Sequence, residues 1–96
     1  MTTRITEIEE QGDREAILKV EGTLTLEDAR LLEEVCKNVR VRDGRVVRID
    51  LAGLSFVDEE SASLLRRLNG LPGVVLEGAH LFVKQAIEQA ERNGDD

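Results

Sequence analysis

Polar and hydrophobic residues alternate in three short stretches of the chain. The alternation is clearest over residues 15–21 (EAILKVE) and 46–51 (VVRIDL), and a shorter run covers residues 73–77. A period of two predicts strands that are buried on one side only. A weaker strand is expected within residues 1–10, where the apolar positions are out of strict alternation.

Three other stretches repeat their apolar residues at helical spacing, at about residues 25–40, 59–70 and 80–92. Thr25, with Asp28 three positions later, resembles a capping box at the start of the first of these helices. The residues expected to face the core are Ala29, Leu32, Val35, Cys36, Val39, Ala62, Leu65, Leu68, Val83, Ala86, Ile87 and Ala90.

Glycine, proline and aspartate separate these elements. Gln11-Gly12-Asp13 is expected to join the first two strands into an antiparallel hairpin. Ala52-Gly53-Leu54 is expected to form a turn after the strand at 46–51, and residues 70–73 to end the middle helix. Residues 93–96 are interpreted as a frayed tail.

The resulting element order is ββαβαβα, in which the repeated strand–helix–strand units predict parallel neighbouring strands. Because the strands alternate instead of being apolar throughout, helices should cover only one face of the sheet. The predicted fold is a two-layer α/β sandwich, with three helices on one face of a mixed, mostly parallel four-stranded sheet. Ninety-six residues are the length of one domain, so residues 1–96 are expected to form a single domain.

The amino-acid composition makes some classes of function less probable than others for this protein. The formal net charge of −7, with 20 acidic and 13 basic residues, argues against a nucleic-acid partner. Phe56 and Phe82 are the only aromatic residues, so the core must be aliphatic. The single cysteine, Cys36, is expected to be a small buried hydrophobic residue.

The sequence has no signal-peptide pattern and no apolar run long enough to span a bilayer, so a cytoplasmic protein without membrane insertion is expected. It also lacks a metal-ligand spacing of Cys and His, a G-x-G-x-x-G pattern and a P-loop pattern. We therefore expect no metal and no cofactor.

The acidic cluster Asp58-Glu59-Glu60 opens the middle helix, where the helix dipole is positive. Adjacent helical residues do not converge on one point, so capping by Asp58 and presentation to a partner explain the cluster better than catalysis or metal binding. Leu54, Phe56 and Val57, just before it, are expected in the core or in the wall of a binding groove.

A nucleophilic serine would need a base within hydrogen-bond reach. Ser55, Ser61 and Ser63 have no histidine near them in sequence, and His80 opens a different helix. We therefore expect no catalytic residue, and His80 is interpreted as a surface residue at a helix terminus.

The stretch VVRIDLAGLSFVDEESASLL resembles the strand–turn–helix signature of STAS domains, the fold of bacterial anti-sigma-factor antagonists and of the cytoplasmic part of sulfate transporters. A second match is Gly73-Val74-Val75-Leu76-Glu77-Gly78-Ala79, followed by the last helix. The resemblance covers residues 13 to about 92, the expected core of the domain.

In phosphorylated STAS domains, a serine at the start of the second helix accepts phosphate from a kinase that is also the anti-sigma factor. The resemblance places Asp58 on the aspartate of that motif and Glu60 on the acceptor serine, with Ser61 where glycine is common. Glutamate offers no hydroxyl to such a kinase. The hypothesis is therefore that the protein is not switched by phosphorylation at this position.

The resemblance implies a non-enzymatic anti-sigma-factor-antagonist-like module that regulates transcription by partner switching in a bacterial cell. The partner would be an anti-sigma factor with serine-kinase activity, or a scaffold protein as in stressosomes. Another interpretation is the soluble STAS subunit of a lipid-transporting ABC transporter, bound to its ATPase. A homodimer is also considered, because the strand at 73–77 is expected at a sheet edge. The predicted partner-binding residues are Leu54, Ser55, Phe56, Asp58, Glu59, Glu60, Ser61, Ser63 and Arg66.

Overall fold

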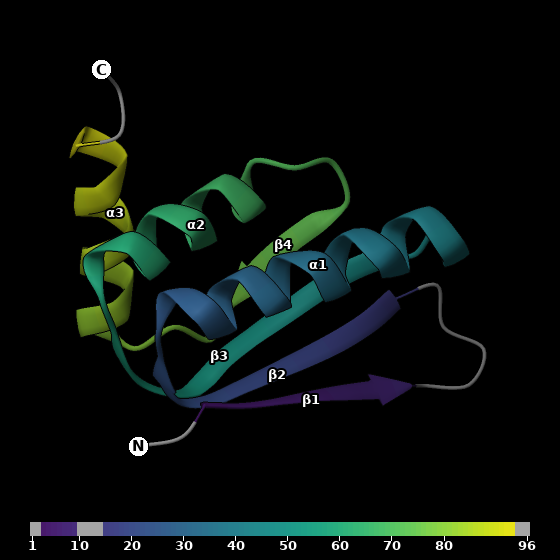
Figure 1. Cartoon of the computed structure of the whole chain (residues 1–96), viewed down its shortest axis with the longest axis horizontal. Helices are drawn as coiled ribbons and strands as arrows, with labels where there is room; N and C mark the ends of the chain where they lie inside the picture. Colours follow the sequence, from purple (N-terminus) through teal and green to yellow (C-terminus); the bar gives the residue numbers. More distant parts are fainter. Residues whose placement is uncertain (1–2, 10–14, 94–96) are drawn as a thin grey trace.

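The computed structural model describes residues 3–9 and 15–93, and it confirms the predicted ββαβαβα order (Figure 1). The predicted turn at residues 11–13 lies outside the described residues. Residue 93 belongs to the last helix, so the predicted tail is wrong there, and residues 94–96 are not described. The elements are β1 (Thr3–Glu9), β2 (Glu15–Leu24), α1 (Leu26–Asp43), β3 (Val46–Val57), α2 (Glu59–Asn69), β4 (Val74–Glu77) and α3 (Leu81–Asn93).

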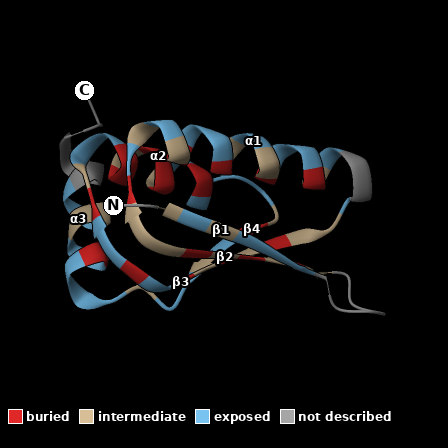
Figure 2. Ribbon diagram, turned by 60° about the horizontal axis from the view of Figure 1, so that its bottom comes forward, coloured by how far each residue is buried: buried red, intermediate tan, exposed pale blue. Residues whose placement is uncertain are grey.

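The four strands form one mixed sheet in the order β1-β2-β3-β4. β1 and β2 pair antiparallel, whereas β2 with β3 and β3 with β4 pair parallel. Figure 2 shows α1 and α2 as a layer over one face of this sheet, and α3 packs against α2 and β3. The predicted fold class is therefore confirmed, and β4 lies at a sheet edge as expected.

The core between these layers is aliphatic. Alternate residues of β2 and of the first half of β3 face the helices, while their neighbours, such as Lys19, Arg48 and Asp50, are partly exposed on the other face. Burying such apolar surface is the main favourable term in folding. The largest fully buried side chains are Leu18, Leu24, Leu32, Ile49, Leu51, Leu54, Leu65, Leu68, Val20, Val39, Val47 and Val83.

The predicted turn at Ala52-Gly53-Leu54 is wrong, because β3 runs on through these residues to Val57. Gly53 pairs with Glu21 of β2 beside a register shift. A Cβ atom at Gly53 would lie only 2.7 Å from the Cγ atom of Glu21. Glycine is therefore present because the two strands approach closely, and not because the chain turns.

Burial along β3 changes period at this irregularity. Up to Leu51 every second residue is buried, but beyond it the buried residues are Leu54 and Val57, three apart. This change leaves Phe56 58% exposed. The expectation that Leu54 and Val57 are core residues is confirmed, whereas Phe56 lies at the surface.

The capping box predicted at the start of α1 is also wrong. Thr25 is the N-cap residue, but its side chain makes no capping bond to the backbone. Its hydroxyl instead donates to the Asp28 carboxylate, with 3.1 Å between Oγ1 and Oδ2. α1 continues past the predicted residue 40 and ends where Gly44 takes a left-handed φ of 64°.

Candidate functional site

The junction between β3 and α2 is organised by Asp58. This residue has extended backbone angles, and its Oδ1 atom accepts the Ser61 N–H at 2.8 Å. Its carbonyl oxygen accepts the first helical bond, from the Ala62 N–H at 2.9 Å. Asp58 is therefore the N-cap of α2, as predicted, and its side chain satisfies one of the donors that a helix start leaves open, the Ser61 N–H.

Glu59 and Glu60 occupy the first turn of α2, and both are exposed. Neither carboxylate forms an ion pair or hydrogen bond with another described side chain. Negative charge in this turn is favoured by the helix dipole, by about 0.3–1 kcal/mol per group. The helix dipole thus stabilises the Glu59 and Glu60 carboxylates in this turn, and both are accessible to a partner.

The three serines near the junction differ in accessibility. Ser61 is 0% exposed, and its hydroxyl finds no hydrogen-bond partner among the described residues. The Ser63 hydroxyl donates to the Glu59 carbonyl at 3.2 Å, and the exposed Ser55 hydroxyl donates to the Gly22 carbonyl at 3.0 Å. Ser61 is therefore an interior side chain, and Ser55 and Ser63 reach the surface.

The predicted partner-binding residues divide into three groups. Ser55, Phe56, Asp58, Glu59, Glu60 and Ser63 lie together around the start of α2. Leu54 and Ser61 belong to the core and present no surface. Arg66 lies eight residues after Asp58, which is about 12 Å further along the helix axis. It therefore lies outside the cluster at the start of α2.

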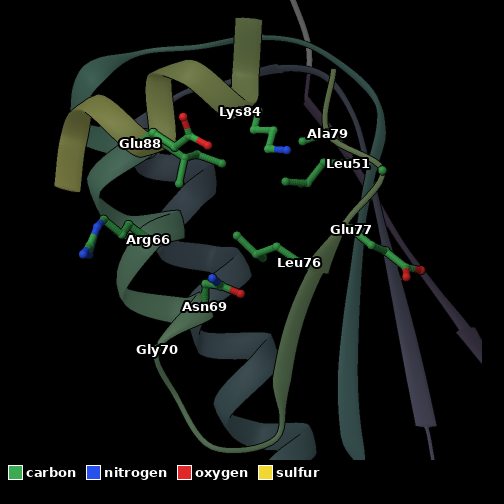
Figure 3. A pocket seen from close by; sticks show the side chains of 11 residues that line it. Leu51, Arg66, Asn69, Gly70, Leu76, Glu77, Ala79, Lys84 and Glu88 are labelled. Atoms are coloured by element: carbon green, nitrogen blue, oxygen red, sulfur yellow. The ribbon is translucent and has the colours of Figure 1, made fainter. Parts of the chain in front are cut away.

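Arg66 instead borders a cavity of about 520 Å³ between α2, α3 and the end of β4 (Figure 3). Leu51, Leu76 and Ile87 give its lining an apolar part, and Lys84 and Glu88 of α3 also border it. The volume lies within the range of ligand clefts, but this cavity is widely open to solvent and would not enclose a small molecule. No sequence motif predicts this cavity, because its walls come from elements that lie far apart in the chain.

His80 has a structural contact. Its ring Nε2 lies 2.6 Å from the carbonyl oxygen of Ala52 in β3, and its own carbonyl accepts the Lys84 N–H at 2.9 Å. The residue is exposed at the start of α3, as predicted. Its side chain holds that helix start against the sheet.

Cys36 is fully buried, and burial raises the pKa of its thiol. A buried neutral thiol is a poor nucleophile and a poor metal ligand. In the described part of the chain, no three His, Cys, Asp or Glu side chains gather in a way that would hold a metal ion. Within the same residues, no helix combines the length and apolar character needed to cross a membrane.

Neither the protein-family models nor the curated proteins compared with this sequence gave a match. Among solved structures, the chain is similar to an uncharacterised protein of the DUF3478 family from Shewanella loihica PV-4, which is described as having a SpoIIAA-like fold. The TM-score is 0.59 at 22% sequence identity, over 95% of this chain and 78% of that one. The chain therefore has the SpoIIAA-like fold, which is the fold of STAS domains and anti-sigma-factor antagonists.

Proposed function

We propose that this protein is a non-enzymatic interaction module that docks a partner protein through the start of α2. We define the docking surface as Ser55, Phe56, Glu59, Glu60 and Ser63. The observation that carries this proposal is the exposure of Glu59 and Glu60 on a helix start that Asp58 has already capped. The two glutamates are not required to close the helix, so their charge is available to a partner.

Phe56 supports the same proposal. It is 58% exposed and stands two residues before the Asp58 cap. Aromatic side chains are enriched at the centres of protein interfaces, where they bury a large area at low conformational cost. An exposed aromatic ring beside fixed carboxylates suits a partner surface that has an apolar pocket and basic residues around it.

The charge of the docking surface is permanent. Under the STAS resemblance, Glu60 stands at the phospho-acceptor position and carries about one negative charge, whereas phosphoserine carries about −1.5 to −2. The neighbouring Ser61 is buried, so its hydroxyl does not replace the lost acceptor. We therefore propose constitutive binding that phosphorylation at residue 60 does not regulate.

Two kinds of partner fit such a surface. The first is an anti-sigma factor or serine kinase, which would make the protein an unswitched anti-sigma-factor antagonist. The second is a permanent assembly, either a stressosome-like scaffold or the ATPase of a lipid-transporting ABC transporter. Glu60 cannot be phosphorylated as serine is, and this favours the second kind of partner, because a permanent complex needs no phosphorylation switch. The identity of the bound protein decides between them.

Affinity co-purification from the native host tests the proposal with three baits. The wild-type bait should retain one specific partner, and a bait carrying Phe56→Ser with Glu60→Lys should lose it. The control is Val75→Ser, which changes an exposed apolar residue of β4 away from the docking surface. A partner retained equally by all three baits would contradict the proposed docking surface.

Phosphorylation gives a second test. If the captured partner is a kinase, incubation of the wild-type protein with that kinase and ATP should leave it unmodified. The variant Glu60→Ser should accept phosphate if the geometry of the family switch is intact. Phosphate on wild-type Ser55 or Ser63, with a change in affinity for the partner, would contradict constitutive binding.

A further inference from the structure

The start of α3 exposes two large apolar side chains. Leu81 is 68% and Phe82 82% exposed, whereas the next residue, Val83, is 1% exposed. The fold therefore uses Val83 to anchor the helix and makes little use of Phe82. Single exposed apolar side chains are common on protein surfaces, but Leu81 and Phe82 are adjacent and together form a small apolar patch.

A second apolar feature lies at the C-terminal end of α1. A cavity of about 360 Å³ opens between this helix and the connection from α2 to β4. Two exposed apolar residues contribute to its lining: Val41 is 87% exposed and Leu71 is 36% exposed. The lining residues are Cys36, Lys37, Arg40, Val41, Leu71, Pro72 and Val74.

These two features lie at opposite ends of the molecule. Figure 1 shows the start of α3 together with the starts of α1 and α2 at one end, and the end of α1 with the α2–β4 connection at the other. The chain extends 38 Å along this longest direction. One chain therefore cannot place its own Phe82 in its own cavity, but a second copy can.

The predominant charge differs between the two ends. Glu27, Glu59 and Glu60 lie in the first turns of α1 and α2, at the same end as Phe82. Arg40 and Lys37, which pairs with Glu33 at 3.9 Å, border the cavity at the other end, whereas Lys84 is the one cation in the first turn of α3. Complementary charge of this kind steers two surfaces together and fixes their orientation.

We propose that copies of this chain associate head to tail, with Phe82 of one copy seated in the apolar cavity at the end of α1 of the next. An apolar cavity of ~150 Å³ already accepts a benzene ring, so the observed volume is sufficient. This interaction goes beyond the proposed function and does not depend on it, although Glu59 and Glu60 belong both to the docking surface and to this end of the molecule.

The contact is heterologous, since it joins two different patches. Heterologous contacts build open chains or rings instead of closing as a two-fold dimer. The wild-type protein should therefore form a concentration-dependent series of species larger than a dimer. Increasing the ionic strength should weaken the association, because salt screens the opposite charges at the two ends.

Sedimentation velocity with paired variants tests the proposal. Phe82→Gln removes the ring, and the double variant Val41→Gln with Leu71→Gln places polar groups at the cavity. Each change should weaken self-association at least ~10-fold, the ratio expected from the loss of one buried large apolar side chain. Leu31→Gln is the control, because Leu31 is 51% exposed on α1 and neither lines the cavity nor lies in the first turn of α3.

Mixing the two kinds of variant gives the sharpest result. The Phe82→Gln chain keeps its cavity, and the double variant keeps its Phe82, so an equimolar mixture should form a 1:1 dimer and nothing larger. Circular dichroism should show that all variants keep the wild-type fold. A wild-type protein that stays monomeric at high concentration, or variants that fail to pair when mixed, would overturn the proposal.

Discussion

The His80 ring and the Ala52 carbonyl are joined by a 2.6 Å contact between residues 28 positions apart in the sequence. Ala52 lies just beyond the point where β4 stops pairing with β3, since the last pair is Asp50 with Glu77. The Ala52 N–H is bonded as well, to the Asp50 carboxylate at 2.9 Å. The side chains of His80 and Asp50 thus supply the hydrogen bonds that β4 no longer gives to Ala52, and His80 also fixes the start of α3.

We expect His80→Ala to lower the free energy of unfolding by about 0.5–1.5 kcal/mol, the net value of one hydrogen bond. The site is exposed, so water partly replaces the ring and the lower half of this range is expected. Urea denaturation measures the change. The control is Gln85→Ala, at an exposed position of α3 for which no hydrogen bond is described, and its stability should be unchanged. Equal stability of the two variants would contradict a positioning role for His80.

Asp58→Ala should destabilise the protein by about 1 kcal/mol, because it leaves the Ser61 N–H without its acceptor and removes a charge from the helix start. Asp58→Asn keeps an acceptor oxygen and should recover most of that loss. Thermal unfolding followed by circular dichroism distinguishes the two. If both variants lose the same stability, the capping bond is not what holds the start of α2.

The Asp58 cap could be predicted from the sequence because capping is local: the residue types and their spacing determine it within one turn. The element order was predictable for the same reason. The length of β3 was not, because the local cue at Ala52-Gly53-Leu54 resembles a turn. Only pairing with Glu21 and Gly22 of β2 keeps this segment extended, and such pairing is not visible in a single stretch of sequence.

The candidate functional site also combines local features, which the sequence predicts, with features that depend on pairing and packing, which it does not. The exposure of Glu59 and Glu60 follows from their place on an amphipathic helix and could be predicted. The exposure of Phe56 could not, since it depends on the change of period within β3. One cavity is formed by residues from four separate segments and the other by residues from two, so both appear only once the sheet and the helices are packed together.

We expect Ser61→Ala to stabilise the protein. The Ser61 hydroxyl is fully buried and has no hydrogen-bond partner among the described residues, which costs about 1–3 kcal/mol for such a group. Alanine also has the highest helix propensity. A gain of about 1 kcal/mol in urea denaturation is expected, whereas Ser63→Ala, at a partly exposed position, should change stability by less. A loss of stability in Ser61→Ala would indicate that the hydroxyl has a partner, such as a buried water.

Cys36 should resist alkylation in the folded protein. Burial removes access and raises the pKa of its thiol, so little thiolate is present near neutral pH. Iodoacetamide labelling followed by mass spectrometry should be at least ~100-fold slower than for the urea-unfolded chain. Rapid labelling under native conditions would show that the wall of the cavity beside α1 moves enough to expose the buried thiol.

The same thiol gives a pH dependence of known sign. Below pH ~8.5, the ordinary pKa of a free cysteine, the thiol is neutral in both states and stability is unaffected. As the pH rises above that value, the unfolded thiol ionises before the folded one, so the free energy of unfolding falls. The variant Cys36→Ala has no thiol to ionise, so its free energy of unfolding should fall less steeply above this pH than that of the wild-type protein. Identical slopes for the two proteins above pH ~8.5 would contradict a raised pKa.

Three glycines form a series that separates backbone strain from packing. Gly44 has a φ of 64° with open space around it, so Gly44→Ala should cost about 1 kcal/mol from left-handed strain alone. Gly73 has a φ of 79°, and a Cβ atom there would lie 2.7 Å from the Arg40 Nη1, which is held by the Arg45 carbonyl. Gly73→Ala should therefore cost more than Gly44→Ala, by about 1 kcal/mol or more.

Gly70 completes the series as the matched control. Its φ of −83° is right-handed, and the nearest atom to an added Cβ would be the Arg67 carbonyl oxygen at 3.5 Å. Gly70→Ala should therefore be neutral or stabilising by up to about 1 kcal/mol, through the lower entropy of the unfolded chain. Urea denaturation of the three variants should rank Gly70→Ala above Gly44→Ala, and Gly44→Ala above Gly73→Ala. If Gly73→Ala is no worse than Gly44→Ala, the Arg40 side chain moves aside freely and does not tie the end of α1 to the α2–β4 connection.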